Sequence, residues 1–273
     1  MTIEQKILFT DLDGTLLNRE KTISPRTFQV LKAFATAGHT IVLSTGRDLN
    51  STKNVRRTLG LMFPAMYLIA YNGGQIYDCD QQKILHRLSM NTDDALRILE
   101  TSAKMGVYSH TYTDSHIISP GMSEELAYYQ RIIDTPVVFS DNMENSLTKD
   151  PNKCLAIALD GHGRLAALRA QLEHVLTSVT FAYSASVLLD MLPATSGKGK
   201  ALLRLCDMLG IPPENAIAAG DAENDLPMLK AAGLSIAMCD GAASLKEVAD
   251  IVTTTDNDHD GLALVLEDIL GLT

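Results

Sequence analysis

Several features that mark large protein classes are missing from this sequence. No apolar run approaches the roughly 18 residues that a membrane-spanning helix needs. Basic runs are also absent, and 23 Lys and Arg against 33 Asp and Glu give a formal net charge of -10. These absences argue against nucleic acid and anionic membrane surfaces as the main partners, and against a membrane pump.

Cysteine is scarce, and its spacing is not that of a metal or disulfide site. The four cysteines lie far apart, without CxxC spacing and without a secretory leader: Cys79, Cys154, Cys206 and Cys239. Neither a zinc site nor a disulfide framework is indicated. We therefore expect the protein to work in the reducing cytoplasm.

Both ends of the chain show short apolar strands that alternate with helices. Ser24 and Pro25 indicate a helix start, apolar residues recur after them at helical spacing, and Gly38 is placed to end the helix. Strand-like apolar segments occupy residues 6–10, 39–45, 66–74, 215–221, 234–238 and 250–254. Short continuous apolar strands separated by helices are typical of a parallel sheet covered by helices.

The middle of the chain has a different rhythm. Residues 88–190 contain helical patterns between short strand candidates, which together make an α+β unit of ordinary domain size. The composition, 46% hydrophobic and 21% charged, is that of a folded globule. We therefore predict an α/β fold, with a Rossmann-like parallel-sheet core (1–87 and 191–273) and an inserted α+β cap domain (88–190).

Two carboxylates follow the first predicted strand. Asp11 and Asp13 stand in the segment FTDLDGT, and side chains two apart on a strand point to the same face, roughly 7 Å apart. Such a pair makes most sense with a cation or a charged substrate between its members. The alternative is an Asp-Gly turn that closes a hairpin, which accounts for Asp13 but not for Asp11.

Three further places near predicted strand ends or helix starts carry chemically useful side chains. They are the segment LSTGRD at 43–48, Lys198 at the start of a predicted helix, and the segment GDAEND at 220–225. Ligands bind at the carboxyl ends of the strands in open parallel sheets. Carboxylates, a hydroxyl, backbone amides and an ammonium suit phosphoryl transfer, and an all-oxygen donor set favours Mg²⁺ over zinc.

The motifs DLDGT, STGR, the helix-opening Lys198 and GDAENDLPML, in this order and with an insertion between the second and third, resemble the haloacid dehalogenase (HAD) superfamily. The likeness is greatest to its Cof-type sugar-phosphate phosphatases, whose α/β cap lies at that insertion. The resemblance implies that Asp11 is the nucleophile and a metal ligand. It also implies that Asp13 is the acid/base and offers its backbone carbonyl to the metal, and that the amide of Leu12 contacts phosphate.

The resemblance extends to the other motifs. Thr45 and Gly46 match the phosphate-binding second motif, and Lys198 matches the lysine of the third, although Lys200 is a neighbouring alternative. Arg47 would place a guanidinium beside the phosphate and so select anionic substrates.

The fourth motif supplies three residues. Asp221 matches the metal-binding acid, Asn224 a phosphate or metal-water contact, and Asp225 an acid that supports the site. The implied function is a Mg²⁺-dependent phosphatase that hydrolyses small phosphorylated metabolites, with sugar phosphates first, through an aspartyl-phosphate. A phosphomutase or phosphotransferase stays open, because an acceptor hydroxyl can replace water. A phosphorylatable switch is disfavoured, since Asp13 would hasten hydrolysis of the aspartyl-phosphate.

Some positions and properties are left open. Asn72 and Gly73 follow a core strand, and turn chemistry explains them as well as substrate contact does. Asp190 could face solvent at the hinge or contact substrate. Neither the individual substrate nor the oligomeric state follows from these patterns.

Overall fold

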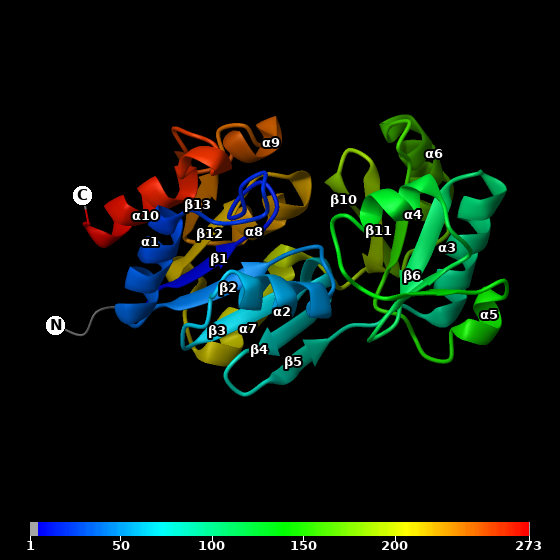
Figure 1. The fold of residues 1–273 in the computed structure, drawn as a ribbon, viewed down its shortest axis with the longest axis horizontal. Coiled ribbons are helices and arrows are strands. Elements are labelled where there is room, and N and C mark those ends of the chain that lie inside the picture. Colours follow the sequence, from blue (N-terminus) through cyan, green and yellow to red (C-terminus); the bar gives the residue numbers. More distant parts are fainter. Residues whose placement is uncertain (1–4, 273) are drawn as a thin grey trace. The chain divides into compact units, whose positions relative to one another are not determined.

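The computed structural model describes residues 5–272 and forms two compact units. The core unit contains the described residues up to Thr45, the segment Thr52–His86 and the residues from Gly197 onward. The cap unit contains Gly46–Ser51 and Arg87–Ser196. Figure 1 shows both units as ribbons. The domain boundaries expected at 87/88 and 190/191 stay a prediction.

A largely parallel sheet forms the centre of the core unit. Its strand order within residues 5–272 is β14-β13-β12-β1-β2-β3-β4-β5. The bounds are β1 (Ile7–Thr10), β2 (Thr40–Ser44), β3 (Met66–Ala70), β4 (Gln75–Asp78), β5 (Lys83–Arg87), β12 (Ala216–Gly220), β13 (Leu234–Ala237) and β14 (Ile251–Val252). From β14 to β3 all neighbours pair in parallel, while β3 and β4 pair antiparallel. The predicted α/β class with a parallel-sheet core is confirmed.

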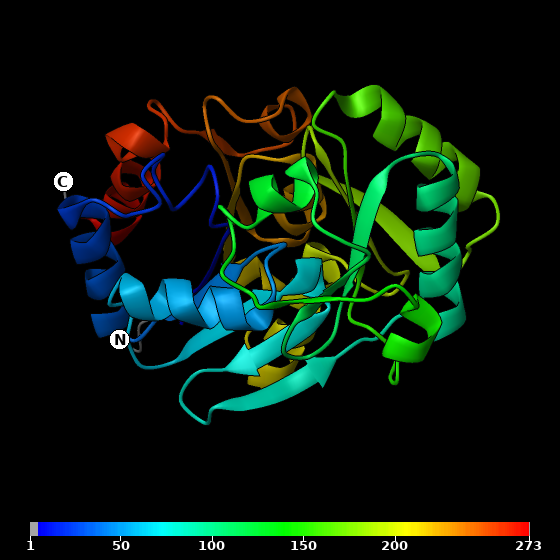
Figure 2. The same ribbon diagram turned by 45° about the vertical axis from the view of Figure 1, so that its right-hand side comes forward.

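Helices cover this sheet because its central strands are apolar on both faces. They are α1 (Pro25–Thr36), α2 (Leu49–Thr58), α7 (Lys198–Leu209), α8 (Leu226–Ala231), α9 (Ala243–Lys246) and α10 (Gly261–Leu270). Helices α7 and α8 pack against each other and, with β1, β2 and β12, contribute to one apolar cluster. Helices α1 and α10 pack together, and they lie side by side in both ribbon views (Figures 1 and 2).

Helix α1 starts and ends where its sequence signals predict. The hydroxyl of Ser24 accepts the backbone N–H of Thr27 at 3.0 Å, and Pro25 occupies the first turn. The helix ends at Thr36, and Gly38 adopts a φ of 86°. A side chain with a Cβ disfavours that backbone conformation, so glycine suits the turn into β2.

The cap unit has a second sheet, with the strand order β10-β11-β9-β6-β7-β8 within the described residues. Its strands are β6 (Tyr108–Tyr112), β7 (Ile117–Ser119), β8 (Val137–Phe139), β9 (Cys154–Ile157), β10 (Val179–Ala185) and β11 (Leu188–Pro193). Its helices are α3 (Thr92–Lys104), α4 (Glu124–Tyr129), α5 (Met143–Ser146) and α6 (His162–Glu173). Helices α3 and α6 supply the apolar side chains that bury one face of the sheet.

An ion pair is buried within the cap unit. The side chains of Lys153 and Asp190 are 1% and 0% exposed, and Lys153 Nζ lies 2.5 Å from Asp190 Oδ1. Lys153 Nζ also donates to the carbonyl of Gly46 at 2.9 Å and lies 5.0 Å from the centre of the Tyr112 ring. Burial opposes the charge of Lys153, but Asp190 outweighs that effect with help from Tyr129, and the pKa of Lys153 is raised. Of the two alternatives left open for Asp190, exposure to solvent is wrong, because its side chain is buried as the partner of a buried lysine.

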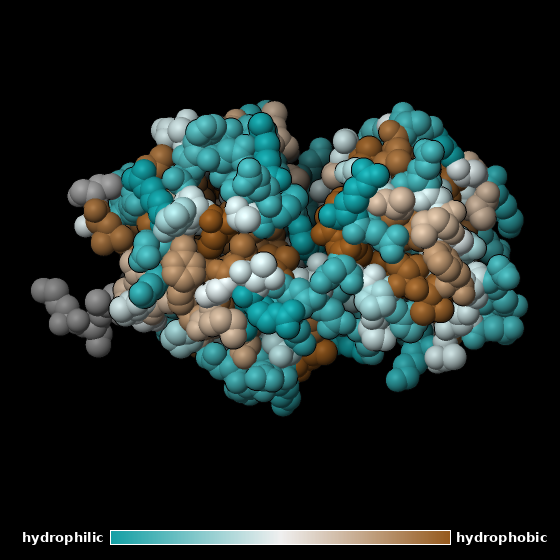
Figure 3. Space-filling view, in the orientation of Figure 1, coloured by the Kyte–Doolittle hydropathy of each residue, from teal (hydrophilic) through white to brown (hydrophobic). Residues whose placement is uncertain are grey.

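The surface carries no continuous apolar face in the view of Figure 3, where hydrophilic residues separate the hydrophobic patches. Exposed apolar side chains such as Met62, Met122 and Phe139 are ordinary for a folded protein. Within residues 5–272, no helix combines the length and apolarity needed to cross a membrane.

The buried ion pair generates a first prediction. Asp190→Ala leaves the Lys153 ammonium buried without its carboxylate, so we expect the free energy of unfolding to fall by about 3–5 kcal/mol. Urea unfolding followed by circular dichroism measures this loss. The double variant Lys153→Met, Asp190→Leu removes both charges and should recover most of the lost stability. An unchanged urea midpoint for Asp190→Ala would contradict the conclusion that Asp190 neutralises the buried ammonium of Lys153.

Candidate active site

Asp11 and Asp221 are brought together by the pairing of two neighbouring parallel strands. Asp11 follows β1 and Asp221 follows β12, and the register places Thr10 opposite Ala219. The backbone N–H of Asp11 donates to the carbonyl of Ala219 at 3.0 Å, which continues the ladder to the edge of the sheet. Two residues that are far apart in sequence therefore meet at one carboxyl edge, where ligands bind in this class of sheet.

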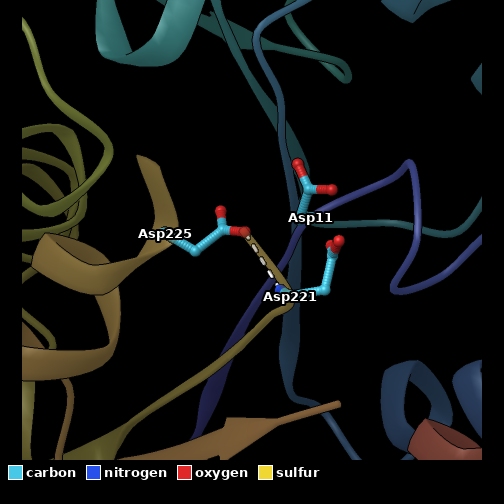
Figure 4. A group of neighbouring side chains, drawn as sticks. All are labelled: Asp11, Asp221 and Asp225. Atoms are coloured by element: carbon cyan, nitrogen blue, oxygen red, sulfur yellow. Dashed lines mark hydrogen bonds between the residues drawn. The ribbon is translucent and has the colours of Figure 1, made fainter. Parts of the chain in front are cut away.

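Asp225 completes a group of three carboxylates. It lies in a 3₁₀ turn, Glu223–Asp225, directly after β12. Asp11, Asp221 and Asp225 each offer one oxygen, and these atoms all lie within 4.8 Å of one another. Figure 4 shows the three side chains gathered close together, with Asp225 coming from the turn after β12.

Lys198 joins two of these carboxylates. Its Nζ lies 2.5 Å from Oδ1 of Asp11 and 2.5 Å from Oδ1 of Asp225, and its side chain is fully buried. Lys198 is the first residue of α7, whose apolar side holds it against the sheet. Lys200, the alternative, is exposed. The two carboxylates outweigh the burial of Lys198 and raise the pKa of its ammonium, so it is charged at neutral pH.

Asp225 acts mainly on its neighbours. Its Oδ1 accepts from Lys198, while its Oδ2 accepts the backbone N–H of Asp221 at 3.1 Å and of Ala222 at 3.2 Å. By accepting these two N–H groups, Asp225 Oδ2 holds the backbone that carries Asp221. The dashed line in Figure 4 marks the hydrogen bond from the Asp221 N–H. With both oxygens engaged, Asp225 is best placed to orient Asp221 and Lys198.

The other two carboxylates are poised for a cation. Burial raises the pKa of Asp11 well above its usual value, and the charges of Asp225 and Asp221 raise it further, although Lys198 opposes them. Burial and Asp225 raise the pKa of Asp221 to about 6, against the hydrogen bond from Thr15. A divalent cation between the two would favour their ionised forms. Hard oxygen donors at this spacing suit Mg²⁺, so the residues present fit that ion.

The turn after β1 also supports Asp221. Thr15 Oγ1 donates to Asp221 Oδ1 at 2.8 Å. Gly14 has a φ of 90°, and a Cβ at this position would lie only 2.4 Å from Asp221 Oδ2. Glycine is therefore required both by the backbone conformation and by the closeness of the carboxylate.

Asp13 lies apart from the three-carboxylate group. Its Oδ1 forms an ion pair with Lys21 Nζ at 2.8 Å, and the two side chains are 33% and 52% exposed. Sequence reasoning did not identify Lys21, since it lies eight residues after Asp13 in no motif. Only the fold of the loop between β1 and α1 reveals the pair.

Two residues predicted to bind phosphate, Leu12 and Thr45, form backbone hydrogen bonds within the core unit. Leu12 is buried, and its carbonyl accepts the backbone N–H groups of Leu16 and Leu17 at 3.1 and 2.8 Å. The N–H of Thr45 donates to the carbonyl of Ile69 at 2.8 Å, so the amide of Thr45 already has a partner. If Thr45 contacts phosphate, its hydroxyl is the better candidate.

Asn224 and the second-motif residues have partners that the sequence did not reveal. Asn224 Nδ2 donates to Asn72 Oδ1 at 2.9 Å. Gly46 and Arg47 belong to the segment Gly46–Ser51, which packs with the cap unit. The sequence gave one signal for these contacts, which is that Asn72 follows a core strand.

The contact between Gly14 and Asp221 generates the second prediction. Gly14→Ala should lower kcat/KM for a small aryl phosphate by about a hundredfold, because the new Cβ displaces a carboxylate of the site. Gly38→Ala is the matched control, since Gly38 has nearly the same φ of 86° but no atom within 4 Å of where its Cβ would stand. Both variants should lose on the order of 1 kcal/mol of stability, but only the first should lose activity. Equal activities, measured beside thermal unfolding, would contradict this interpretation.

Known proteins are similar to this chain in sequence and in fold. A family model described as haloacid dehalogenase-like hydrolase matches residues 8–266. The Bacillus subtilis protein YwtE, named 5-amino-6-(5-phospho-D-ribitylamino)uracil phosphatase, is 29% identical over 97% of this chain and 98% of its own length.

Solved structures agree with the family match. A haloacid dehalogenase-like hydrolase from Bacteroides thetaiotaomicron superimposes with a TM-score of 0.87 at 25% identity, covering 97% of this chain and 100% of that one. A Thermotoga maritima structure gives a TM-score of 0.82 at 29% identity, covering 97% of each chain. The chain therefore belongs to the haloacid dehalogenase-like hydrolases, and it is a phosphatase of that family.

Proposed function

We propose that this phosphatase depends on Mg²⁺ and hydrolyses small phosphorylated metabolites, with sugar phosphates as the first class to test. The observation that carries the proposal is the placement of Lys198 Nζ 2.5 Å from Asp11, beside Asp221. A buried ammonium next to two cation-ready carboxylates supports the binding of a phosphate dianion together with a divalent metal. The name of YwtE, which refers to a phosphorylated ribityl compound, supports a polyhydroxylated phosphate ester as substrate.

In the proposed reaction, Asp11 attacks phosphorus and forms an aspartyl-phosphate while the bond to the leaving oxygen breaks. Asp13 gives its proton to the leaving oxygen and then takes a proton from the water that hydrolyses the intermediate. The half-exposed position of Asp13 is compatible with both proton transfers. Mg²⁺ would be held by Asp11, Asp221 and the carbonyl of Asp13, and when bound it would neutralise charge on the phosphoryl oxygens.

The phosphate group would be held by neutral donors as well as by charge. We assign this role to the amides of Leu12 and Gly46, the hydroxyl of Thr45 and the side chain of Asn224. Lys198 would neutralise the phosphate while Asp225 holds its ammonium in place.

The choice of substrate is proposed to reside in residues 88–190, with Arg47 selecting for negative charge. None of the residues assigned here to catalysis or metal binding falls in that segment. The four cysteines are free thiols, which supports the proposed place of work in a reducing cytoplasm.

The proposal is tested by phosphate release from a panel of phosphorylated metabolites in the presence of Mg²⁺, with no acceptor added. Release from sugar phosphates supports a phosphatase of the proposed class. Transfer that requires an added hydroxyl compound would instead indicate a phosphotransferase. No release from any compound would overturn the proposal.

The third prediction concerns the nucleophile. Asp11→Asn should reduce kcat by at least about a thousandfold, because a neutral amide neither attacks phosphorus nor binds a metal well. Circular dichroism should show an intact fold, and ³²P labelling should find no phosphoenzyme. A variant with activity within about tenfold of the parent would exclude Asp11 as nucleophile.

The fourth prediction concerns the metal. Chelation with EDTA should abolish turnover, and Mg²⁺ should restore it, because Asp11 and Asp221 present only hard oxygen donors. Ca²⁺ should not restore turnover, since its larger and looser coordination misplaces the attacking and leaving oxygens. Full activity after exhaustive chelation would contradict the Mg²⁺ requirement.

A further inference from the structure

The chain adopts an unusual backbone where β3 ends. Tyr71, Asn72 and Gly73 have successive φ values of 52°, 49° and 96°. Two of these residues carry a side chain: asparagine tolerates this left-handed region better than most residues, whereas an aromatic residue such as Tyr71 disfavours it. Such conformations persist where the surrounding structure requires them, and they concentrate at functional sites.

Asn72 contacts two of the residues proposed to bind phosphate. Its backbone N–H donates to the carbonyl of Thr45 at 2.9 Å, at the end of β2. Its side-chain Oδ1 accepts from Asn224 Nδ2 at 2.9 Å, in the turn after β12. Asn72 is only 2% exposed. One buried residue within the core unit therefore connects the second and fourth motifs.

The same turn also meets the third motif. A Cβ on Gly73 would lie 2.4 Å from the carbonyl oxygen of Gly197, the residue before Lys198. The turn Tyr71–Gly73 is thus packed against the start of α7 as well. This close approach explains why glycine follows Asn72, but it does not explain the amide side chain of Asn72.

Two polar atoms of the Asn72–Asn224 pair have no protein partner. Asn72 Nδ2 and Asn224 Oδ1 are both buried, and the structure provides neither an acceptor for the first nor a donor for the second. A buried amide in a turn of purely structural function would normally satisfy these atoms within the protein. Unsatisfied groups beside a proposed phosphate site are what a polar ligand would complete.

We propose that Asn72 is a positioning residue of the phosphate site, which orients the side-chain amide of Asn224 and holds the Thr45 segment for a bound phosphate group. The inference rests on the proposed function of Thr45 and Asn224. The left-handed backbone and the hydrogen bond to Thr45 fix the position of the Asn72 amide, and the hydrogen bond from Asn224 then fixes the rotation of the second amide. A turn made for chain reversal alone would need only the backbone conformation.

The test separates the side chain from the backbone. Asn72→Gly keeps the N–H that bonds Thr45 and accommodates the left-handed conformation, but it removes the amide that holds Asn224. We expect kcat/KM for the best phosphate ester to fall between about tenfold and about a hundredfold, and inhibition by inorganic phosphate to weaken. Gln82→Gly, at a φ of 51° in the turn between β4 and β5, makes the same backbone change and should leave both values unchanged.

A double-mutant cycle shows whether Asn72 acts through Asn224. Asn224→Ala should lower kcat/KM, and adding Asn72→Gly should lower it little further, because the residue that Asn72 positions is already gone. Independent, multiplicative losses would overturn the proposal. So would an Asn72→Gly protein that folds and keeps the parent's kcat/KM and phosphate inhibition. A wild-type protein without phosphatase activity would instead refute the proposed function.

Discussion

The ammonium of Lys198 is the group on which the candidate active site depends. Three carboxylates gathered within a few ångströms would repel one another, and burial would drive them toward protonation. Lys198 stands between Asp11 and Asp225 and offsets part of that repulsion. Because it is the first residue of α7, the packing of one amphipathic helix on the sheet sets the electrostatics of the site.

The sheet determines which residues meet this ammonium. Parallel pairing of β1 with β12 brings Asp11 beside Asp221, and the tight turn at Gly14 lets the chain pass close to the Asp221 carboxylate. The turn at Asn72 then joins the ends of β2 and β12 through a backbone and a side-chain hydrogen bond. The site is therefore built from the short turns that follow the strands at the carboxyl edge of the sheet, and close contacts or hydrogen bonds hold these turns in place.

The cap unit also contains a buried ion pair, but this pair lies outside the group of three carboxylates. Lys153 and Asp190 are buried together among aromatic side chains, and Lys153 also bonds the carbonyl of Gly46. Residues Gly46–Ser51, which follow Thr45 directly, pack with this unit. The second motif is thus shared, with its threonine in one unit and its glycine and arginine in the other. Apolar residues of similar size often replace such a buried pair at little cost in stability, whereas the loss of one partner is strongly destabilising.

The sequence by itself determined the fold class, the alternation of short apolar strands with helices at both ends of the chain, and the residue types at the ends of β1, β2 and β12. Apolar runs, capping residues and the spacing of the motifs are local properties, so they can be read without coordinates. The strands β4 and β5 were not predicted, because polar residues interrupt the apolar residues of both and β5 lies at the edge of the sheet. Only the tertiary structure decided that Asp13 pairs with Lys21, that Lys153 pairs with Asp190, and that Asn72 holds Asn224. These contacts depend on which loops and strands meet in space, and no local pattern encodes that meeting.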